Sequence, residues 1–257
     1  MLTHLSLFSG IGGLDLAAEW AGFETVGQCE WADYPTKVLE RHWPDVPRWR
    51  DVRGLTTESF MERTGRKKVT VVSGGFPCQP HSVAGKRMAS DDERDLWSEL
   101  CRIFRETDAG WMVAENVPGL LSSENGRFFG RVLRDLASMG CDAFWYCFPA
   151  YDCGAKFRGE RVFIVATSDS ERWRGMAENQ KVRPDAKYME MLESWEAGQN
   201  NLLPYPRRKQ SGGSGGKERN DDGLSAGLGA LKGYGNSVVP YQAYPLFKAI
   251  AEIEEEL

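Results

Sequence analysis

Apolar runs and amphipathic stretches alternate along the first 167 residues, and this alternation restricts the fold more than any other sequence feature. Short runs rich in valine, leucine and phenylalanine predict strands, and helical spacing of apolar residues follows most of them. The expected strands are 2–8, 25–29, 69–73, 111–114, 144–148 and 161–167, and the expected helices are 14–20, 32–41, 96–104 and 128–138. Strands that alternate with helices form a mostly parallel sheet covered on both faces. We therefore predict an α/β protein with a doubly wound sheet.

The alternation stops after residue 167. Residues 168–229 are rich in arginine, proline, glycine and asparagine, with one convincing helical pattern at 186–196, and predict a loop-rich insert. Within it, residues 211–216 read Ser-Gly-Gly-Ser-Gly-Gly, which is as typical of an engineered flexible linker as of a natural loop. The last residues, 241–257, predict an amphipathic helix with an acidic end that returns to the sheet.

Length and residue usage exclude several classes of protein. The 257 residues are 41% hydrophobic and 27% charged, which is ordinary for a globular chain and excludes intrinsic disorder as the main state. The longest purely apolar run, 162–166, is far shorter than the ~18 residues of a membrane-spanning helix, and residues 1–9 do not resemble a secretory signal. Six cysteines without a Cys-x-x-Cys pair, with only three histidines, predict neither a metal site nor a disulfide framework. We expect a non-secreted protein with reduced thiols in a cytoplasm.

Charge is distributed unevenly along the chain. The formal net charge is −5, which argues against a protein that coats nucleic acid by bulk charge. Residues 155–220 nevertheless carry 13 Lys and Arg against 9 Asp and Glu, a net of +4, so that the remainder carries −9. This basic segment either binds a polyanion locally or forms an ordinary solvated surface.

A glycine-rich turn joins the first expected strand to the first expected helix. Phe8-Ser-Gly-Ile-Gly-Gly13 lies where a strand feeds a helix, and glycines there let the backbone approach a nucleoside-sized ligand. The spacing is not that of a dinucleotide fingerprint, and such turns also serve packing alone. Carboxylates at the next strand ends favour the ligand interpretation: Glu30, with Trp31 beside it, suits a ribose and an adenine, and Asp51 suits an exocyclic amine. Each is otherwise an ordinary surface residue.

A cysteine and a carboxylate follow the next two expected strands. The strand at 69–73 leads into Gly74-Gly-Phe-Pro-Cys-Gln-Pro-His-Ser82, and the following strand leads into Glu115-Asn-Val-Pro-Gly119. Most buried cysteines are inert packing residues. Cys78, however, follows a proline in a glycine-flanked loop at the edge where such sheets bind ligands. A thiol and a carboxylic acid that face one pocket can perform covalent addition with acid assistance.

These motifs resemble those of the DNA (cytosine-5) methyltransferase family. Phe8-Ser-Gly-Ile-Gly-Gly13, Gly75-Phe-Pro-Cys-Gln79, Glu115-Asn-Val117, Gly159-Glu-Arg161 and Gly235-Asn-Ser-Val238 occur in the family's order. The resemblance covers about residues 1–167 and 228–250. Families that methylate exocyclic amines carry an Asp/Asn-Pro-Pro-aromatic segment after the fourth strand, which this chain does not have.

The resemblance implies a role for each catalytic candidate. Cys78 would add to C6 of cytosine, so that C5 can take a methyl group from S-adenosylmethionine. Glu115 would hydrogen-bond N3 and the exocyclic amine, and Arg161 would hold O2 and support the thiolate. The target base would flip out of the duplex, and Gln79 and Ser82, with Pro80, His81 and residues 86–94, would form the loop that closes over it. His81 is equally typical of a solvated loop histidine.

The resemblance also implies where S-adenosylmethionine binds. The expected cofactor residues lie in the glycine turn, at the following strand ends and around the pocket mouth: Phe8, Gly10, Ile11, Gly12, Gly13, Glu30, Trp31, Asp51, Val52, Phe76, Leu96, Asn236 and Ser237.

The chain departs from the family pattern in two places. Where the family usually has Gln-x-Arg-x-Arg, this chain has Phe157-Arg-Gly-Glu-Arg161, which leaves the role of Arg158, assigned to the DNA and loop residues, open. The stretch for target recognition, about 60 residues, is short and contains the Gly/Ser run, so either reduced specificity or a trimmed chain is expected.

We therefore predict an S-adenosylmethionine-dependent DNA cytosine-C5 methyltransferase. Residues 1–167 would form a Rossmann-like catalytic domain, 168–228 a reduced target-recognition region, and 229–257 a segment that returns to the catalytic domain. The candidate DNA contacts are basic and aromatic residues of the target-recognition region: Arg172, Trp173, Arg174, Arg183, Lys187, Arg207 and Arg208.

The expected partner is double-stranded DNA, with no membrane. We expect a monomer located in the cytoplasm and encoded by a bacterium or a phage. The recognition sequence and a cognate restriction endonuclease cannot be read from the sequence. Two alternatives stay open. One is a tRNA cytosine-C5 methyltransferase of the same family, and the other is a catalytically silent DNA-binding regulator.

Overall fold

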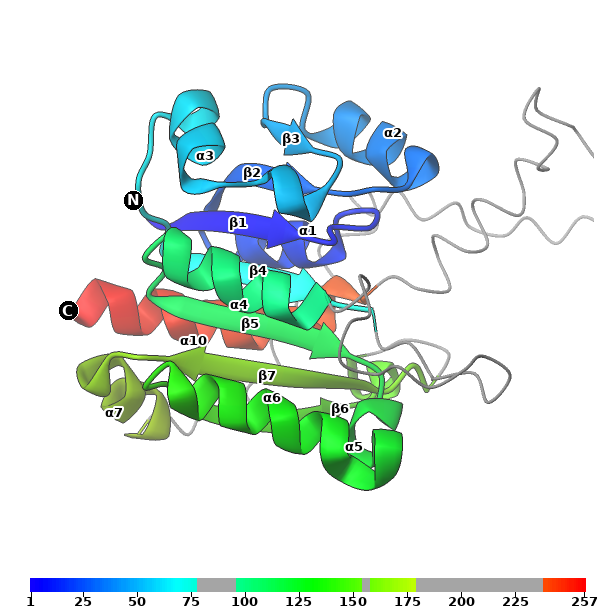
Figure 1. Cartoon of the computed structure of the whole chain (residues 1–257), viewed down its shortest axis with the longest axis vertical. Helices are drawn as coiled ribbons and strands as arrows, with labels where there is room; N and C mark the ends of the chain where they lie inside the picture. Colours follow the sequence, from blue (N-terminus) through cyan, green and yellow to red (C-terminus); the bar gives the residue numbers. More distant parts are fainter. Residues whose placement is uncertain (78–95, 154–157, 179–237) are drawn as a thin grey trace, which may run out of the picture.

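A single seven-stranded sheet organises the chain (Figure 1). The computed structural model describes residues 1–77, 96–153, 158–178 and 238–257. The strand order is β3-β2-β1-β4-β5-β7-β6; the first five strands are parallel, and β7 runs antiparallel to both β5 and β6. The strands are β1 (Thr3–Leu7), β2 (Glu24–Cys29), β3 (Arg48–Trp49), β4 (Val71–Gly75), β5 (Trp111–Asn116), β6 (Asp142–Phe148) and β7 (Arg161–Thr167). The predicted doubly wound, mostly parallel α/β sheet is confirmed.

Helices cover both faces of the sheet. They are α1 (Gly13–Trp20), α2 (Asp33–His42), α3 (Thr57–Thr64), α4 (Leu96–Glu106), α5 (Gly119–Ser122), α6 (Arg127–Ser138), α7 (Ser170–Glu178) and α10 (Pro240–Glu256), with 3-10 turns η1 (Val52–Gly54), η2 (Ser123–Gly126) and η3 (Ala150–Cys153). Alternate residues of one strand serve two cores: Met112 and Ala114 of β5 pack under α4 and α6, whereas Trp111 and Val113 pack under α7 and α10. Central strands are therefore apolar at nearly every position.

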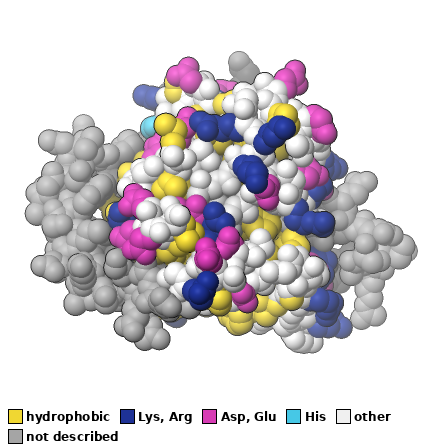
Figure 2. Space-filling view, turned by 90° about the vertical axis from the view of Figure 1, so that its left-hand side faces the viewer, with side chains coloured by type: hydrophobic (Ala, Val, Ile, Leu, Met, Phe, Trp, Pro, Cys, Tyr) yellow, Lys and Arg dark blue, Asp and Glu magenta, His cyan; other side chains and the backbone are white. Residues whose placement is uncertain are grey.

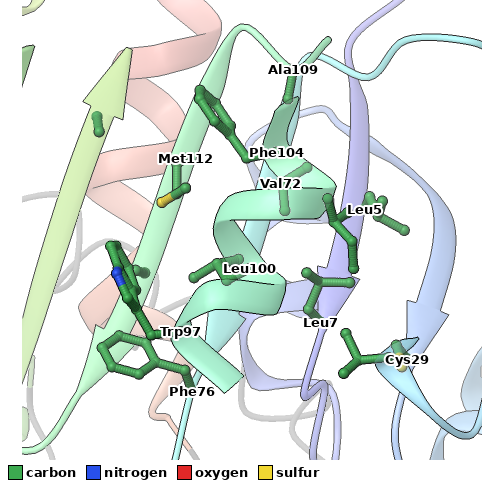
Figure 3. Packing of buried hydrophobic residues seen from close by; sticks show 14 of the residues in the cluster. Leu5, Leu7, Cys29, Val72, Phe76, Trp97, Leu100, Phe104, Ala109 and Met112 are labelled. Atoms are coloured by element: carbon green, nitrogen blue, oxygen red, sulfur yellow. The ribbon is translucent and has the colours of Figure 1, made fainter. Parts of the chain in front are cut away.

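Helix α4 shows how an amphipathic stretch closes one of these cores. Trp97, Leu100 and Phe104 recur at helical spacing and are buried against β1, β4 and β5 (Figure 3). The ring of Phe76, just after β4, lies 5.1 Å from that of Trp97 between centroids. This contact fixes the backbone at the point where the chain leaves β4.

The C-terminal helix α10 lies along α1 on the other face (Figure 1). Phe247 is fully buried, with its ring 5.8 Å from that of Phe23 and 5.4 Å from that of His4. Distant parts of the sequence therefore complete the second core together.

Three helices, α3, α7 and the four-residue α5, were not predicted from the sequence, and neither was the two-residue strand β3. Helix α3 has few apolar residues but begins at a capping box in which Thr56 and Ser59 satisfy each other's backbone N–H groups. Helix α7 falls in the stretch expected to be loop-rich, and it packs on α10 through the buried Met176. The helix expected at 186–196 and the Gly/Ser run at 211–216 lie outside the described residues.

The parallel strands β1, β2, β4 and β5 end at one edge of the sheet, which we call the carboxyl edge (Figure 1). Because β7 is antiparallel, it begins at this edge, at Arg161, and ends at the opposite one. Figure 2 views that opposite side, where Lys and Arg lie intermixed with Asp and Glu. Such neighbouring charges largely cancel, which makes this side a poor surface for a polyanion. Within the described ranges, no helix has the length and hydropathy to cross a membrane.

Candidate active site at the carboxyl edge

A buried ion pair lies at the carboxyl edge. Glu115 near the end of β5 and Arg161 at the start of β7 meet through Oε1 and Nε at 2.9 Å. The Glu115 side chain is 9% exposed and that of Arg161 is 13% exposed. Both residues are sequence candidates for catalysis, and the antiparallel pairing of β5 with β7 brings them together.

Burial sets the protonation of Glu115. Removal of the carboxylate from water raises its pKa from 4.5 to about 7, and the positive charge of Arg161 only partly opposes this shift. Near neutral pH the group is therefore balanced between the acid and the carboxylate. A carboxylic acid with such a pKa can deliver a proton and take it back at physiological pH.

The backbone beside Glu115 is held closely. Gly75 is the register partner of Glu115 in β4, and a Cβ built on Gly75 would lie only 2.7 Å from Oε2 of Glu115. The next residue of β5, Asn116, is buried and donates a hydrogen bond from Nδ2 to the Phe76 carbonyl at 2.8 Å. These contacts fix the segment that leads toward Cys78. Cys78, Gln79 and Ser82 themselves lie outside the described residues.

The glycine-rich turn contains two kinds of glycine. Phe8, Gly10 and Gly12 all have positive φ, at 52°, 55° and 89°, and Gly10 faces open space. A Cβ on Gly12, by contrast, would lie 2.5 Å from the Trp43 ring, and one on Gly13 would lie 2.5 Å from the Val238 carbonyl oxygen. Gly12 and Gly13 thus permit close packing, whereas Gly10 leaves room for a ligand. Ile11 between them is half-buried.

The strand-end residues predicted for the cofactor line the same edge. Glu30 accepts backbone hydrogen bonds from Gly10 at 2.8 Å and from Ala32 at 2.7 Å, so its carboxylate ties the glycine turn to the start of α2. Trp31 is 69% exposed. Asp51 accepts hydrogen bonds from the side chain and backbone of Arg53, which lower its pKa.

The remaining predicted cofactor residues differ in exposure. Val52 and Phe76 are buried in the core under α3 and α4, and Leu96 is half-buried at the start of α4. Asn236 and Ser237 lie outside the described residues. Among the described side chains, no cluster of His, Cys, Asp and Glu could hold a metal ion.

Two arginines predicted to contact DNA have other partners. Arg158 is largely exposed at the carboxyl edge and pairs with Glu160 at 3.3 Å. Arg172 lies at the opposite edge, where it pairs with Asp169 and with Glu254 of α10. Arg172 therefore does not lie beside Glu115 and Arg161, because β7 is antiparallel and carries the chain that follows it away from the carboxyl edge. Its contact with DNA stays a prediction.

The neighbours of Arg172 on α7 were also predicted to contact DNA. Trp173 packs near Phe144, and Arg174 pairs with Glu171 on the surface of α7. Arg183, Lys187, Arg207 and Arg208 lie outside the described residues.

Sequence reasoning assigned no role to two buried polar side chains near the site. Asn116 was noticed only as the neighbour of Glu115. Gln242 of α10 donates from Nε2 to the Phe148 carbonyl at 2.6 Å and to the Gly159 carbonyl at 3.0 Å, which holds the segment before Arg161. The sequence signal that could have identified Gln242 is a glutamine on the apolar face of an expected helix, which predicts a buried hydrogen bond.

Comparison with known proteins adds an independent observation. A family model described as C-5 cytosine-specific DNA methylase matches residues 2–212. The chain is 31% identical over 171 residues to the type II methyltransferase M.NgoBI of Neisseria gonorrhoeae, covering 66% of this chain and 52% of that protein. It is 33% identical over 164 residues to M.NgoMIV of the same species, covering 64% and 51%.

A solved structure agrees with these matches. It is described as a DNA modification methyltransferase encoded within an E. coli prophage, is 27% identical, and superposes with a TM-score of 0.55 over 65% of this chain and 47% of that chain. The chain spans about half the length of the curated relatives it matches.

Proposed function

This chain belongs to the C-5 cytosine-specific DNA methylase family, and from that premise we propose that it methylates C5 of cytosine in double-stranded DNA. Membership of this family implies the use of S-adenosylmethionine. The observation that carries the proposal is the buried Glu115–Arg161 pair, which lies beside the Gly75–Phe76 backbone that leads toward Cys78. The reaction needs an acid that can protonate the cytosine ring and a cation that can hold the ring in place, and this pair offers both at the edge where such sheets bind ligands.

The residues at the carboxyl edge fit the methyl donor. Gly10 leaves open space beside the carboxylate of Glu30, which has acceptor capacity left for ribose hydroxyls after its two backbone hydrogen bonds. Trp31 offers an exposed ring for the adenine, and Asp51 offers a carboxylate for its amine. When bound, S-adenosylmethionine supplies an electrophilic methyl group and leaves as S-adenosylhomocysteine.

Cys78 is proposed as the nucleophile. Its thiolate would form a bond to C6 of the cytosine, which moves electron density onto C5 and makes that carbon able to take up the methyl group. The proton on C5 then leaves to a base, the C5–C6 double bond re-forms, and the thiolate departs with the electrons of the sulfur–C6 bond.

Glu115 and Arg161 would stabilise the charge that develops on the ring. A protonated Glu115 can donate to N3 while Cys78 adds to C6, and its pKa of about 7 keeps that form populated near neutral pH. The guanidinium of Arg161 would hold the ring oxygen O2 while Nε keeps Glu115 oriented.

The substrate is proposed to be a cytosine turned out of duplex DNA, because C5 is inaccessible within the base stack. Gln79, Ser82 and Arg158 would contact the DNA around the flipped base. We also propose that the chain acts as a monomer. Since the matched relatives are named type II methyltransferases, we propose a place in a restriction–modification system, with a cognate restriction endonuclease as its partner.

A trapping experiment tests the whole proposal. The full chain would be incubated with S-adenosylmethionine and with duplex DNA of mixed sequence that contains 5-fluorocytosine. Because fluorine cannot leave as a proton does, a C5 methyltransferase stops after methyl transfer and stays bonded to the DNA through denaturation. We expect this adduct for the wild type and for Cys141→Ala, a control at a half-buried cysteine, but not for Cys78→Ala.

Other outcomes would contradict parts of the proposal. If the adduct forms on tRNA that contains 5-fluorocytosine but not on DNA, the substrate is RNA and not DNA. No adduct on either nucleic acid, with S-adenosylmethionine binding intact, would favour the catalytically silent regulator. An adduct that persists in Cys78→Ala would overturn the assignment of the nucleophile.

A further inference from the structure

A carboxylate is buried against the strands that lead to the predicted cofactor residues. Asp15, in the first turn of α1, has no exposed surface and accepts two hydrogen bonds, from Ser6 Oγ to Oδ2 and from Gln28 Nε2 to Oδ1, both at 2.8 Å. Burial raises its pKa to about 6, although both hydrogen bonds oppose that shift. A carboxylate kept in such a place needs its donors, because a buried polar group without partners is strongly destabilising.

The hydrogen bonds continue across the sheet. Nε of Arg48 donates to Oε1 of Gln28 at 2.9 Å, and since arginine can only donate, the amide nitrogen of Gln28 must face Asp15. Nη2 of Arg48 also donates to the carbonyl of Leu39 at 2.9 Å and to that of Trp43. One connected network therefore joins α1, the sheet and the end of α2.

The three strand residues of this network form one row. Ser6 of β1 is the register partner of Gln28 of β2, and Gln28 is the register partner of Arg48 of β3. Each strand then continues, within two to four residues, to a predicted cofactor contact, and these are Phe8 and Gly10, Glu30 and Asp51 respectively. The row thus lies directly below the three backbone ends that would hold the methyl donor.

We propose that Asp15 is a positioning residue for the methyl-donor pocket, and that its hydrogen bonds to Ser6 and Gln28 set the ends of β1, β2 and β3 relative to one another. The inference rests on the proposed function, because it assigns this row to the same cofactor site. Asp15 touches neither the donor nor the base, so its substitution should weaken donor binding without abolishing the chemistry. Pockets lose affinity when their walls shift by fractions of an ångström.

A comparison of matched variants tests this proposal. Dissociation constants for S-adenosylmethionine would be measured by calorimetry on the full chain, together with melting temperatures. We expect Asp15→Ala to bind at least about tenfold more weakly than the wild type. Asp15→Asn should stay within about threefold, because its amide can accept from Gln28 and donate to the Ser6 oxygen.

Glu254→Ala serves as the structural control. Glu254 is also a carboxylate held by two donor side chains, Trp111 through Nε1 and Arg172 through Nε and Nη2, but it lies at the opposite edge of the sheet. We expect it to lower the melting temperature and to leave the dissociation constant within about twofold of the wild type. Arg48→Gln, at the half-exposed end of the network, should weaken binding of S-adenosylmethionine about threefold or more. If Asp15→Ala does not fold, the affinity of Arg48→Gln is the test of the proposal.

The possible failures are distinguishable. A wild-type chain that binds no S-adenosylmethionine would overturn the proposed function, and this inference with it. A wild type that binds, with Asp15→Ala or Arg48→Gln binding equally well, would overturn this inference alone. If Glu254→Ala loses as much affinity as Asp15→Ala, Asp15 only stabilises the fold, and this inference is also overturned.

Discussion

Glu115 and Arg161 form an ion pair across two antiparallel strands, with 2.9 Å between Oε1 and Nε and with both side chains largely buried. The pair depends on one reversal in the sheet, because β7 must begin where β5 ends. It places a carboxyl with a pKa of about 7 beside a permanent positive charge, and the first three predictions below follow from this relationship.

We expect Glu115→Gln to lose activity while it keeps its fold and its affinity for S-adenosylmethionine. The amide cannot supply the proton, and removal of a general acid costs about 10²- to 10⁴-fold in rate. The measurement is the incorporation of labelled methyl groups into mixed-sequence duplex DNA at saturating cofactor. Glu171→Gln, on the surface of α7, should stay within about twofold of the wild type, and equal rates for all three proteins would contradict the role of Glu115.

The stability of the wild type should depend on pH through Glu115. The folded state binds this proton more tightly than the unfolded state, since the pKa rises from 4.5 to about 7 on folding. The resulting stabilisation is complete below pH 4.5 and is lost as the pH rises through 7. Relative to Glu115→Gln, the free energy of unfolding of the wild type should therefore fall by up to about 3 kcal/mol between pH 4 and 8. Urea titrations at several pH values would measure the free energy of unfolding of both proteins. A difference between them that does not change with pH would contradict the raised pKa of Glu115.

Arg161→Ala should destabilise the protein strongly. It leaves a buried carboxyl without its partner, which costs roughly 3–5 kcal/mol when a buried pair is broken. Because Arg161 lowers the pKa of Glu115, its removal should also raise that pKa above 7. Urea unfolding at pH 8 would measure the loss. Arg158→Ala, whose side chain is 83% exposed, should change stability by less than about 0.5 kcal/mol, and a similar effect for both arginines would contradict the pairing.

Asn116→Ala should slow the trapping reaction. The substitution leaves the Phe76 carbonyl without the Asn116 Nδ2 donor and releases the backbone that leads to Cys78. A buried polar group that loses its partner costs about 1–3 kcal/mol of stability. We expect slower formation of the 5-fluorocytosine adduct at saturating S-adenosylmethionine. The exposed neighbour Val117→Ala is the control, and the idea fails if both variants react at the wild-type rate.

Gly13→Ala and Gly10→Ala should differ in whether they mainly lower the melting temperature or mainly weaken cofactor binding. A Cβ on Gly13 would lie 2.5 Å from the Val238 carbonyl oxygen, so the backbone just before α10 must shift, at a cost of roughly 1–3 kcal/mol. Gly10 faces open space, and its φ of 55° adds only about 1 kcal/mol of backbone strain. Gly13→Ala should therefore lower the melting temperature more, whereas Gly10→Ala should weaken cofactor binding more. Calorimetry measures both quantities, and the reverse order would refute the distinction.

Local pattern in the sequence was sufficient to predict most of the strands and helices and most of the candidate residues. The period of the apolar residues predicted six of the seven strands and the helices α1, α2, α4 and α6, because burial on one or both faces leaves that period in the sequence. It did not predict α3, whose start depends on the hydrogen bonds between Thr56 and Ser59, or α7, whose apolar face is recognised only against α10. Short motifs likewise identified Glu115 and Arg161 as candidates.

Tertiary structure alone decided which of these residues meet. The sequence does not state the direction of β7, yet that direction brings Arg161 to Glu115 and takes Arg172 to the opposite edge. Strand register likewise aligned Ser6, Gln28 and Arg48 under Asp15, and helix packing gave Gly12 and Gly13 different neighbours from Gly10. The physical reason is that a motif encodes the local backbone and the type of side chain, whereas pKa and ion pairing depend on burial and on partners distant in the chain.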